Sequence, residues 1–158
     1  MIDETIRKVL KKFCSRERME NPRPALENIA IRNGKATATD GYKIIEIPIG
    51  EEVKDGMYDQ KTGKDSTNFT DLEDYPNTDQ LFEKLKEPES VVYLDPKFLL
   101  ETAQAMEKLS KKKKRNPRIE DMPMVKIELH GLHQMVVFST ETDDGETIRA
   151  AIMPIRHE

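Results

Sequence analysis

The first regular pattern of apolar and polar positions lies near the start of the chain. Four apolar side chains recur there with the three- and four-residue spacing of one helix face: Ile6, Val9, Leu10 and Phe13. Two acidic residues open the segment, where the helix dipole favours negative charge. The pattern predicts an amphipathic helix over residues 3–16. Its opposite, polar face carries four basic side chains: Arg7, Lys8, Lys11 and Lys12.

The next stretch has the short alternating runs and turn pairs of an antiparallel sheet. Asn33-Gly34 and Asp40-Gly41 are strong turn signals, because glycine and asparagine tolerate a positive φ. We therefore predict three strands over residues 26–31, 35–39 and 42–47.

A similar order recurs toward the C-terminus. Residues 91–94 predict a strand, and Asp95-Pro96 predicts a helix start, with Asp as the N-cap and Pro at the first helical position. Apolar residues recur at helical spacing up to Leu109. Three more strands are predicted over residues 125–129, 135–140 and 147–153.

Residues 49–74 separate the two patterns and lack periodicity, so they predict a long acidic loop, followed by a short helix over 79–85. The expected organisation is a single domain over residues 1–158. Its first half spans residues 1–48 and its second half residues 91–158, and an acidic loop over residues 49–90 connects them. Each half has a helix and an antiparallel sheet, which predicts an α+β fold.

Composition and charge indicate the cellular compartment and the class of binding partner. No apolar run approaches the roughly 20 residues that cross a bilayer, the first residues are too acidic for a secretory signal, and Cys14 is the lone cysteine, which together predict a cytoplasmic protein. The net charge is −4, but residues 51–90 alone hold twelve acids and five bases. The remainder is therefore net positive, and residues 108–118 hold seven Lys or Arg and no acid. Such clustering matters more for attracting a polyanion than the total charge does.

Several segments together resemble a known family. Residues 23–29 lead to Ala38-Thr39-Asp40-Gly41-Tyr42-Lys43-Ile44, much as an RPxLxxV strand leads to ATDGHRLA in the bacterial DNA sliding clamp, the beta subunit of the replicative polymerase. Residues 93–103 are similar to the strand and helix FNxKYLLDAL of that family. Residues 152–156 resemble its closing VMPMRL, and residues 75–77 its FPDY turn.

The resemblance implies a DNA clamp-like domain built from a βαβββ-type repeat. Such clamps are rings of six domains around duplex DNA, which hold polymerases and repair proteins there and have no chemistry of their own. Partner peptides dock in an apolar pocket formed by the two motifs. The implied pocket residues are Thr39, Gly41, Tyr42, Lys43, Ile44, Met153, Pro154, Ile155 and Arg156.

Three features depart from the family pattern. Lys43 replaces an arginine, and the two bases are not interchangeable in fork-like contacts. Ile155 replaces a flexible methionine. The two motifs belong to different domains in the family but to one short chain here, so they meet either within the chain or between subunits. A ring would need about six copies or other subunits.

Two basic groups are the candidate contacts for DNA phosphates, which attract lysine and arginine without regard to sequence. They are the polar face of the first helix, already named, and the run Lys111, Lys112, Lys113, Lys114 and Arg115. The alternative for both is an ordinary solvated surface. The acidic loop either contacts a basic partner, imitates DNA, or is a solubilising insertion.

Residues for catalysis or metal binding are not predicted. The histidines are His130, His133 and His157, and the pair His130 and His133 spans a turn without a nearby cysteine or a suitable carboxylate for zinc. No phosphate-cradling glycine loop or nucleophile elbow is present, so we expect no cofactor.

We therefore expect a non-enzymatic, clamp-like replication accessory protein, a processivity factor that binds duplex DNA non-specifically and docks partner peptides, as an oligomer. A second hypothesis is a monomeric adaptor or decoy with the clamp fold, which binds a replication protein without encircling DNA. A third is an unrelated small enzyme.

Overall fold

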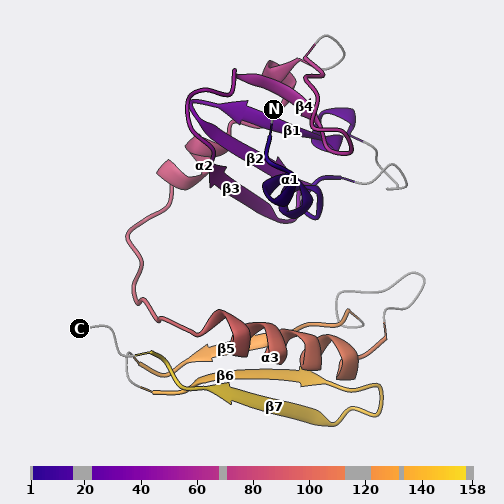
Figure 1. Ribbon diagram of the computed structural model, residues 1–158. Helices are drawn as coiled ribbons and strands as arrows, with labels where there is room; N and C mark the ends of the chain where they lie inside the picture. Colours follow the sequence, from indigo (N-terminus) through magenta and orange to yellow (C-terminus); the bar gives the residue numbers. More distant parts are fainter. Residues whose placement is uncertain (1, 16–22, 68–70, 113–121, 132–133, 156–158) are drawn as a thin grey trace. The chain divides into compact units, whose positions relative to one another are not determined.

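The computed structural model describes residues 2–15, 23–67, 71–112, 122–131 and 134–155. These fall into two compact units, Met1–Leu85 and Lys86–Glu158, here called the N-terminal unit and the C-terminal unit. Both combine helix with antiparallel sheet (Figure 1), so the predicted mixed α+β class is confirmed. Within the described ranges, none of the helices has the length and apolar character that crossing a bilayer requires.

The N-terminal unit begins with helix α1 (Glu4–Lys11), which Asp3 caps by accepting hydrogen bonds from the amides of Thr5 and Ile6. A short 3-10 helix, η1 (Pro24–Glu27), then leads into a four-stranded antiparallel sheet. Its strands are β1 (Asn28–Arg32), β2 (Lys35–Thr39), β3 (Ile44–Pro48) and β4 (Gly56–Asp59), in the spatial order β3-β2-β1-β4. The unit closes with η2 (Leu72–Asp74) and α2 (Thr78–Glu83).

Alternation along β1 gives this sheet two buried faces. Ile29 and Ile31 join a core with Leu10 of α1, while Ala30 joins a second cluster with Leu26 and Tyr75. Successive side chains of a strand point to opposite faces, so one strand contributes to both clusters. As a result, the turn that carries Tyr75 is packed against the sheet opposite α1.

The C-terminal unit is simpler. Helix α3 (Pro96–Leu109) begins at the N-cap Asp95 and packs on a three-stranded antiparallel sheet. The strands are β5 (Lys126–Leu129), β6 (Val136–Glu141) and β7 (Thr147–Ile152), in the order β5-β6-β7. Figure 1 shows α3 lying over this sheet, roughly along the direction of its strands. The buried core consists of Met106, Val136, Phe138 and Ile152.

Three of the predictions need correction. The first helix ends at Lys11 rather than at residue 16. Residues 91–94 do not form a strand, although the amide of Ile155 donates a hydrogen bond to the carbonyl of Tyr93 (2.8 Å). Within the C-terminal unit, no described strand therefore precedes α3, and the predicted βαβββ order is not seen among the described residues of either unit.

The third correction concerns the predicted acidic loop. Residues 56–59 form β4, which pairs with β1 in the register Ile29↔Tyr58. Four residues are too few to display an alternating pattern, and two glycines and several aspartates nearby indicate turns instead. The loop predicted over residues 49–74 also contains η2, and α2 lies close to the short helix predicted over residues 79–85.

Leu10→Ala is expected to lower the free energy of unfolding by about 2–5 kcal/mol, because it leaves a cavity in the fully buried core between α1 and the sheet. Val9→Ala, at the neighbouring, 38% exposed position, is the matched control and should cost less than about 1 kcal/mol. Urea denaturation followed by circular dichroism measures both. Equal losses at the two positions would contradict the packing described.

Candidate functional site

The loop between β2 and β3 holds itself together through its own side chains. The hydroxyl of Thr39 donates to the carbonyl of Lys43 (2.7 Å) and accepts from the amide of Gly41 (3.0 Å). The carboxylate of Asp40 accepts from the amides of Tyr42 and Lys43 (3.0 and 3.1 Å). Gly41 has a φ of +91°, which glycine adopts at little cost. The loop is thus fixed by local chemistry that any Thr-Asp-Gly turn of this shape could use.

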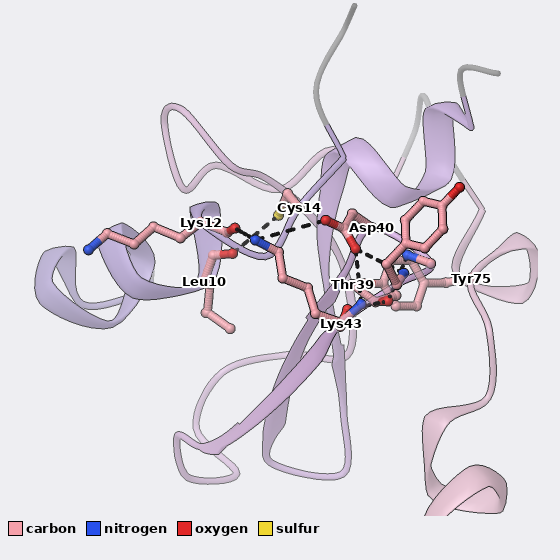
Figure 2. A network of polar contacts seen from close by, with 9 residues as sticks. Leu10, Lys12, Cys14, Thr39, Asp40, Lys43 and Tyr75 are labelled. Atoms are coloured by element: carbon pink, nitrogen blue, oxygen red, sulfur yellow. Dashed lines mark hydrogen bonds and ion pairs between the residues drawn. The ribbon is translucent and has the colours of Figure 1, made fainter. Parts of the chain in front are cut away.

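A buried tyrosine ties this loop to the turn before α2. The hydroxyl of Tyr75 accepts a hydrogen bond from the amide of Thr39 (3.0 Å) and donates to the carbonyl of Thr37 (3.4 Å). Tyr75 is only 2% exposed, and burial raises the pKa of its hydroxyl well above the usual value, so it stays protonated. Figure 2 shows Tyr75 beside Thr39 in this network.

Arg32 fixes the same turn from the end of β1. Its guanidinium donates to the carbonyls of Leu72 (2.5 Å), Tyr75 (3.2 Å) and Pro76 (3.2 Å). The rigid fork of arginine can serve several acceptors at once, which a lysine ammonium does less well. Arg32 was not among the predicted site residues, because its role depends on residues 40 to 44 positions away.

Lys43 directs its charge away from the loop and toward α1. The ammonium donates to the carbonyl of Lys12 (2.7 Å), at the C-terminal end of α1, and lies 3.9 Å from the carboxylate of Asp40. Figure 2 shows these contacts to Lys12 and Asp40. The ammonium also lies 5.2 Å from the centre of the Phe13 ring. A cation is favourable at a helix C-terminus. The charged end of Lys43 therefore stabilises the packing of α1 against the loop.

A cavity of about 320 Å³ lies beside this loop, and we call it the loop pocket. All five residues predicted for this motif line it: Thr39, Gly41, Tyr42, Lys43 and Ile44. Five further residues, which the sequence did not assign, complete its wall: Arg23, Leu26, Pro76, Thr78 and Leu81. Two of these, Arg23 and Leu26, belong to the segment that carries the family resemblance, so that signal was present. Leu81 comes from α2, which only the fold brings to the site.

The predicted C-terminal part of the pocket lies in the other unit. Met153 and Ile155 follow β7 and are 61% and 52% exposed. Met153 lines a separate groove beside α3, with Phe98 and Ile152 among its neighbours. Pro154 lies between them, and Arg156 is outside the described residues. Of the nine predicted pocket residues, the structure thus gathers five in one cavity of the N-terminal unit, and three belong to the C-terminal unit.

The predicted phosphate contacts on α1 differ in what they already bind. The guanidinium of Arg7 donates to the carbonyls of Lys61 and Gln60, and Lys8 pairs with Glu4 (2.8 Å). Lys11 and Lys12 have exposed side chains. Exposed ion pairs such as Lys8–Glu4 are weak, so Lys8 can exchange partners, whereas Arg7 serves the loop after β4.

The second basic group is described only at its start. Lys111 pairs with Glu141 (2.6 Å), and the amide of Lys112 donates to the carboxylate of Asp143 (2.9 Å). These bonds tie the segment after α3 to the end of β6 and the following turn. Lys113, Lys114 and Arg115 lie outside the described residues.

The thiol of Cys14 is buried and poorly suited to act as a nucleophile. Burial, with a smaller effect of Asp40, raises the pKa of the Cys14 thiol to about 12, so the thiolate nucleophile is scarce at neutral pH. The thiol points to the carbonyls of Leu10 and Asn28 (3.6 and 3.7 Å). No group of three His, Cys, Asp or Glu side chains in the described part of the chain is placed to hold a metal ion. His133 and His157 lie outside that part.

Comparisons of this chain with protein-family models, with curated proteins and with solved structures give no match.

Tyr75→Phe is expected to lower the free energy of unfolding by about 1–3 kcal/mol, because it leaves the amide of Thr39 without its partner in a buried place. Tyr42→Phe removes the same atom from a side chain that is 90% exposed and should change stability by less than about 0.5 kcal/mol. Chemical denaturation gives both values, and hydrogen exchange at the Thr39 amide should accelerate only in Tyr75→Phe. Unchanged exchange there would show that the hydroxyl does not hold the loop.

Proposed function

We propose that this protein is a sliding-clamp-like accessory protein of DNA replication, which docks short partner peptides in the loop pocket and binds duplex DNA without sequence preference. The observation that carries the proposal is the loop pocket itself. The five residues that match the family's first peptide-binding motif line a single cavity, although the sequence resemblance alone does not require them to do so.

The chemistry of the loop pocket suits a peptide with large apolar side chains next to a negative charge. Leu26, Ile44 and Leu81 supply apolar wall, and recognition sites of this kind are mostly apolar with a few placed polar groups. Arg23 adds a guanidinium at the same cavity, which suits a carboxylate or a peptide carbonyl. The fixed loop also favours binding, because little chain entropy remains to be lost.

Binding to DNA is proposed first from three exposed lysines: Lys11 of α1, its C-cap Lys12, and Lys112. The sequence alone adds the basic residues 113–115, which lie outside the described part of the chain. Aromatic residues are sparse beside these groups, which favours contact with the duplex backbone over stacking on single-stranded bases.

A second candidate function is a clamp-like adaptor that binds a replication protein but does not encircle DNA. The bonds of Arg7 to two carbonyl oxygens favour it, because they withdraw one of the four predicted phosphate contacts of α1. The net charge of −4 also weakens attraction to DNA at long range. The loop pocket serves both candidates.

Peptide docking is tested with a fluorescent peptide that carries two adjacent leucines and a free C-terminal carboxylate. Leu81→Glu should weaken its binding about tenfold or more, since the change removes apolar wall and places a negative charge beside that of the peptide. Leu85→Glu is the matched control, because Leu85 is 70% exposed and does not line the cavity. It should alter the dissociation constant by less than about twofold. Equal weakening in both variants would place the docking site elsewhere.

Encirclement of DNA is tested by comparing retention on a nicked circular plasmid and on the same plasmid after linearisation. A closed ring stays on the circle and slides off free ends, so gel filtration should recover protein with the circle only. Lys11→Glu with Lys12→Glu should reduce loading on the circle, most strongly at low salt, because two phosphate contacts are lost and with them part of the salt dependence of binding. Equal retention on both templates, or none on either, would favour the adaptor.

A further inference from the structure

Strand β5 is the outer strand of the sheet in the C-terminal unit, and no other described strand pairs with its free edge. Helix α3 packs on β6 and β7 and leaves β5 uncovered. The apolar residues on the helix-facing side are consequently exposed: Val125 by 44%, Ile127 by 58% and Leu129 by 50%. Exposed apolar edge strands are sites where another chain can add a strand.

An open cavity of about 580 Å³ follows the same edge. Leu99 and Met106 of α3 form one wall, and Val125, Ile127 and Phe138 of the sheet form the other. Apolar area left open in this way is unfavourable in water, so a partner that covers it is stabilised by its burial.

The charges on the opposite side of β5 indicate which partner fits. Lys126 and Glu128 lie two positions apart on one face of the strand, and their side chains pair with each other (2.6 Å). When two copies of β5 run antiparallel with a two-fold axis at Ile127, Lys126 of each copy lies opposite Glu128 of the other. On the helix-facing side, Val125 then lies opposite Leu129. Opposite charges and apolar pairs placed directly across two strands stabilise their pairing.

Other registers are worse for the same sequence. An axis at Lys126 or at Glu128 puts two like charges opposite each other, which destabilises pairing. When the second copy is shifted by a single residue, its charged side chains lie on the apolar side of the first copy, because side chains alternate along a strand. The register centred on Ile127 is therefore selected by charge and by polarity at once.

The other edge strands of the described residues lack this self-complementarity. Arg149 is the only charged residue of β7, and Glu46 the only one of β3, which also ends in Pro48. The outer side of β4 is already occupied by the bridge Tyr58↔Asp65. These features favour β5 over the other edges as the place where two copies meet.

We propose that the protein forms a two-fold dimer in which β5 pairs antiparallel with β5 of a second copy, in the register centred on Ile127. The two sheets then continue as one across the axis, and the open cavities beside both α3 helices adjoin it. Such an interface uses the same surface on both copies and closes at two. It does not depend on the proposed function: a dimer that closes at two fits the adaptor directly, and it fits a clamp ring where other subunits complete the ring.

The first experiment is a charge exchange at the interface, measured as molar mass by light scattering over a concentration series. The unchanged protein should approach twice 18.3 kDa as concentration rises. Lys126→Glu and Glu128→Lys, each alone, should raise the dimer dissociation constant about tenfold, because each creates two like-charged pairs. The double variant restores opposite charges and should return to within about threefold of the unchanged protein.

The matched control is Glu146→Lys, which makes the same charge change at an exposed position outside β5 and should leave the dissociation constant unchanged. A monomer at all concentrations, a mass that grows beyond two copies, or a double variant as weak as the single ones would each overturn the proposal. Circular dichroism confirms that the variants are folded.

A cross-link provides a second test that does not depend on charge. In a Cys14→Ala background, Ile127→Cys places two thiols opposite each other on the axis, and mild oxidation should join most of the chains as covalent dimers. Thr147→Cys, on the exposed start of β7, is the control and should cross-link far less. Equal cross-linking at both positions would contradict the proposed axis.

Discussion

The loop pocket depends on a single buried hydroxyl. Tyr75 lies in a turn after η2, far along the chain from β2, yet its hydroxyl bonds both the amide of Thr39 and the carbonyl of Thr37. A polar group that is buried without partners costs free energy, so the turn and the strand end must stay together for the tyrosine to be satisfied. Arg32 imposes the same condition from β1 by bonding three carbonyls of the turn. The cavity has fixed walls because these bonds leave the loop and the turn no independent movement.

Much of this unit could be predicted from the sequence because its turns are local. Asn33-Gly34 and Asp40-Gly41 specify tight turns through their own backbone preferences, and β2 was predicted with its observed bounds. The end of α1 and the strand β4 were missed for a different reason. Tertiary contacts act at these places, such as the bond from Lys43 to the carbonyl of Lys12 after α1 and the pairing of β4 with β1, and they leave no pattern in the nearby residues. The absent strand at 91–94 shows the same limit, since four apolar residues in a row do not require a neighbour to pair with.

The candidate site likewise contains residues that local sequence predicts and residues that only the fold brings in. Residues of the Thr-Asp-Gly loop could be named because they are contiguous, whereas Leu81, Pro76 and Thr78 enter the cavity only through the fold. The contacts that each loop side chain makes were also harder to predict than which residues belong to the loop. Lys43 was expected to face a peptide, but its ammonium is bound to the end of α1 and to Asp40. Spacing along a strand predicts which residues are near a cavity, while the charge at the tip of a long side chain follows the nearest acceptor.

The main constraint on the C-terminal unit is that its one described helix is too narrow to cover the whole sheet, rather than a buried hydrogen bond. One helix lies on the three-stranded sheet, and among the described residues four side chains form the buried core. A helix is about 10 Å wide and adjacent strands are about 4.8 Å apart, so α3 covers roughly two strands and leaves a third exposed. The alternation of Val125, Ile127 and Leu129 that specifies β5 as a strand therefore also places an apolar row at an open edge. The charges of Lys126 and Glu128 keep that edge polar on its other side, and their order along the strand makes it complementary to itself. Strand β5 thus pairs with β6 on one side and leaves the backbone hydrogen-bonding groups of its other edge unpaired. A second copy of the same strand completes this edge most simply, because the same sequence supplies both sides of the pairing.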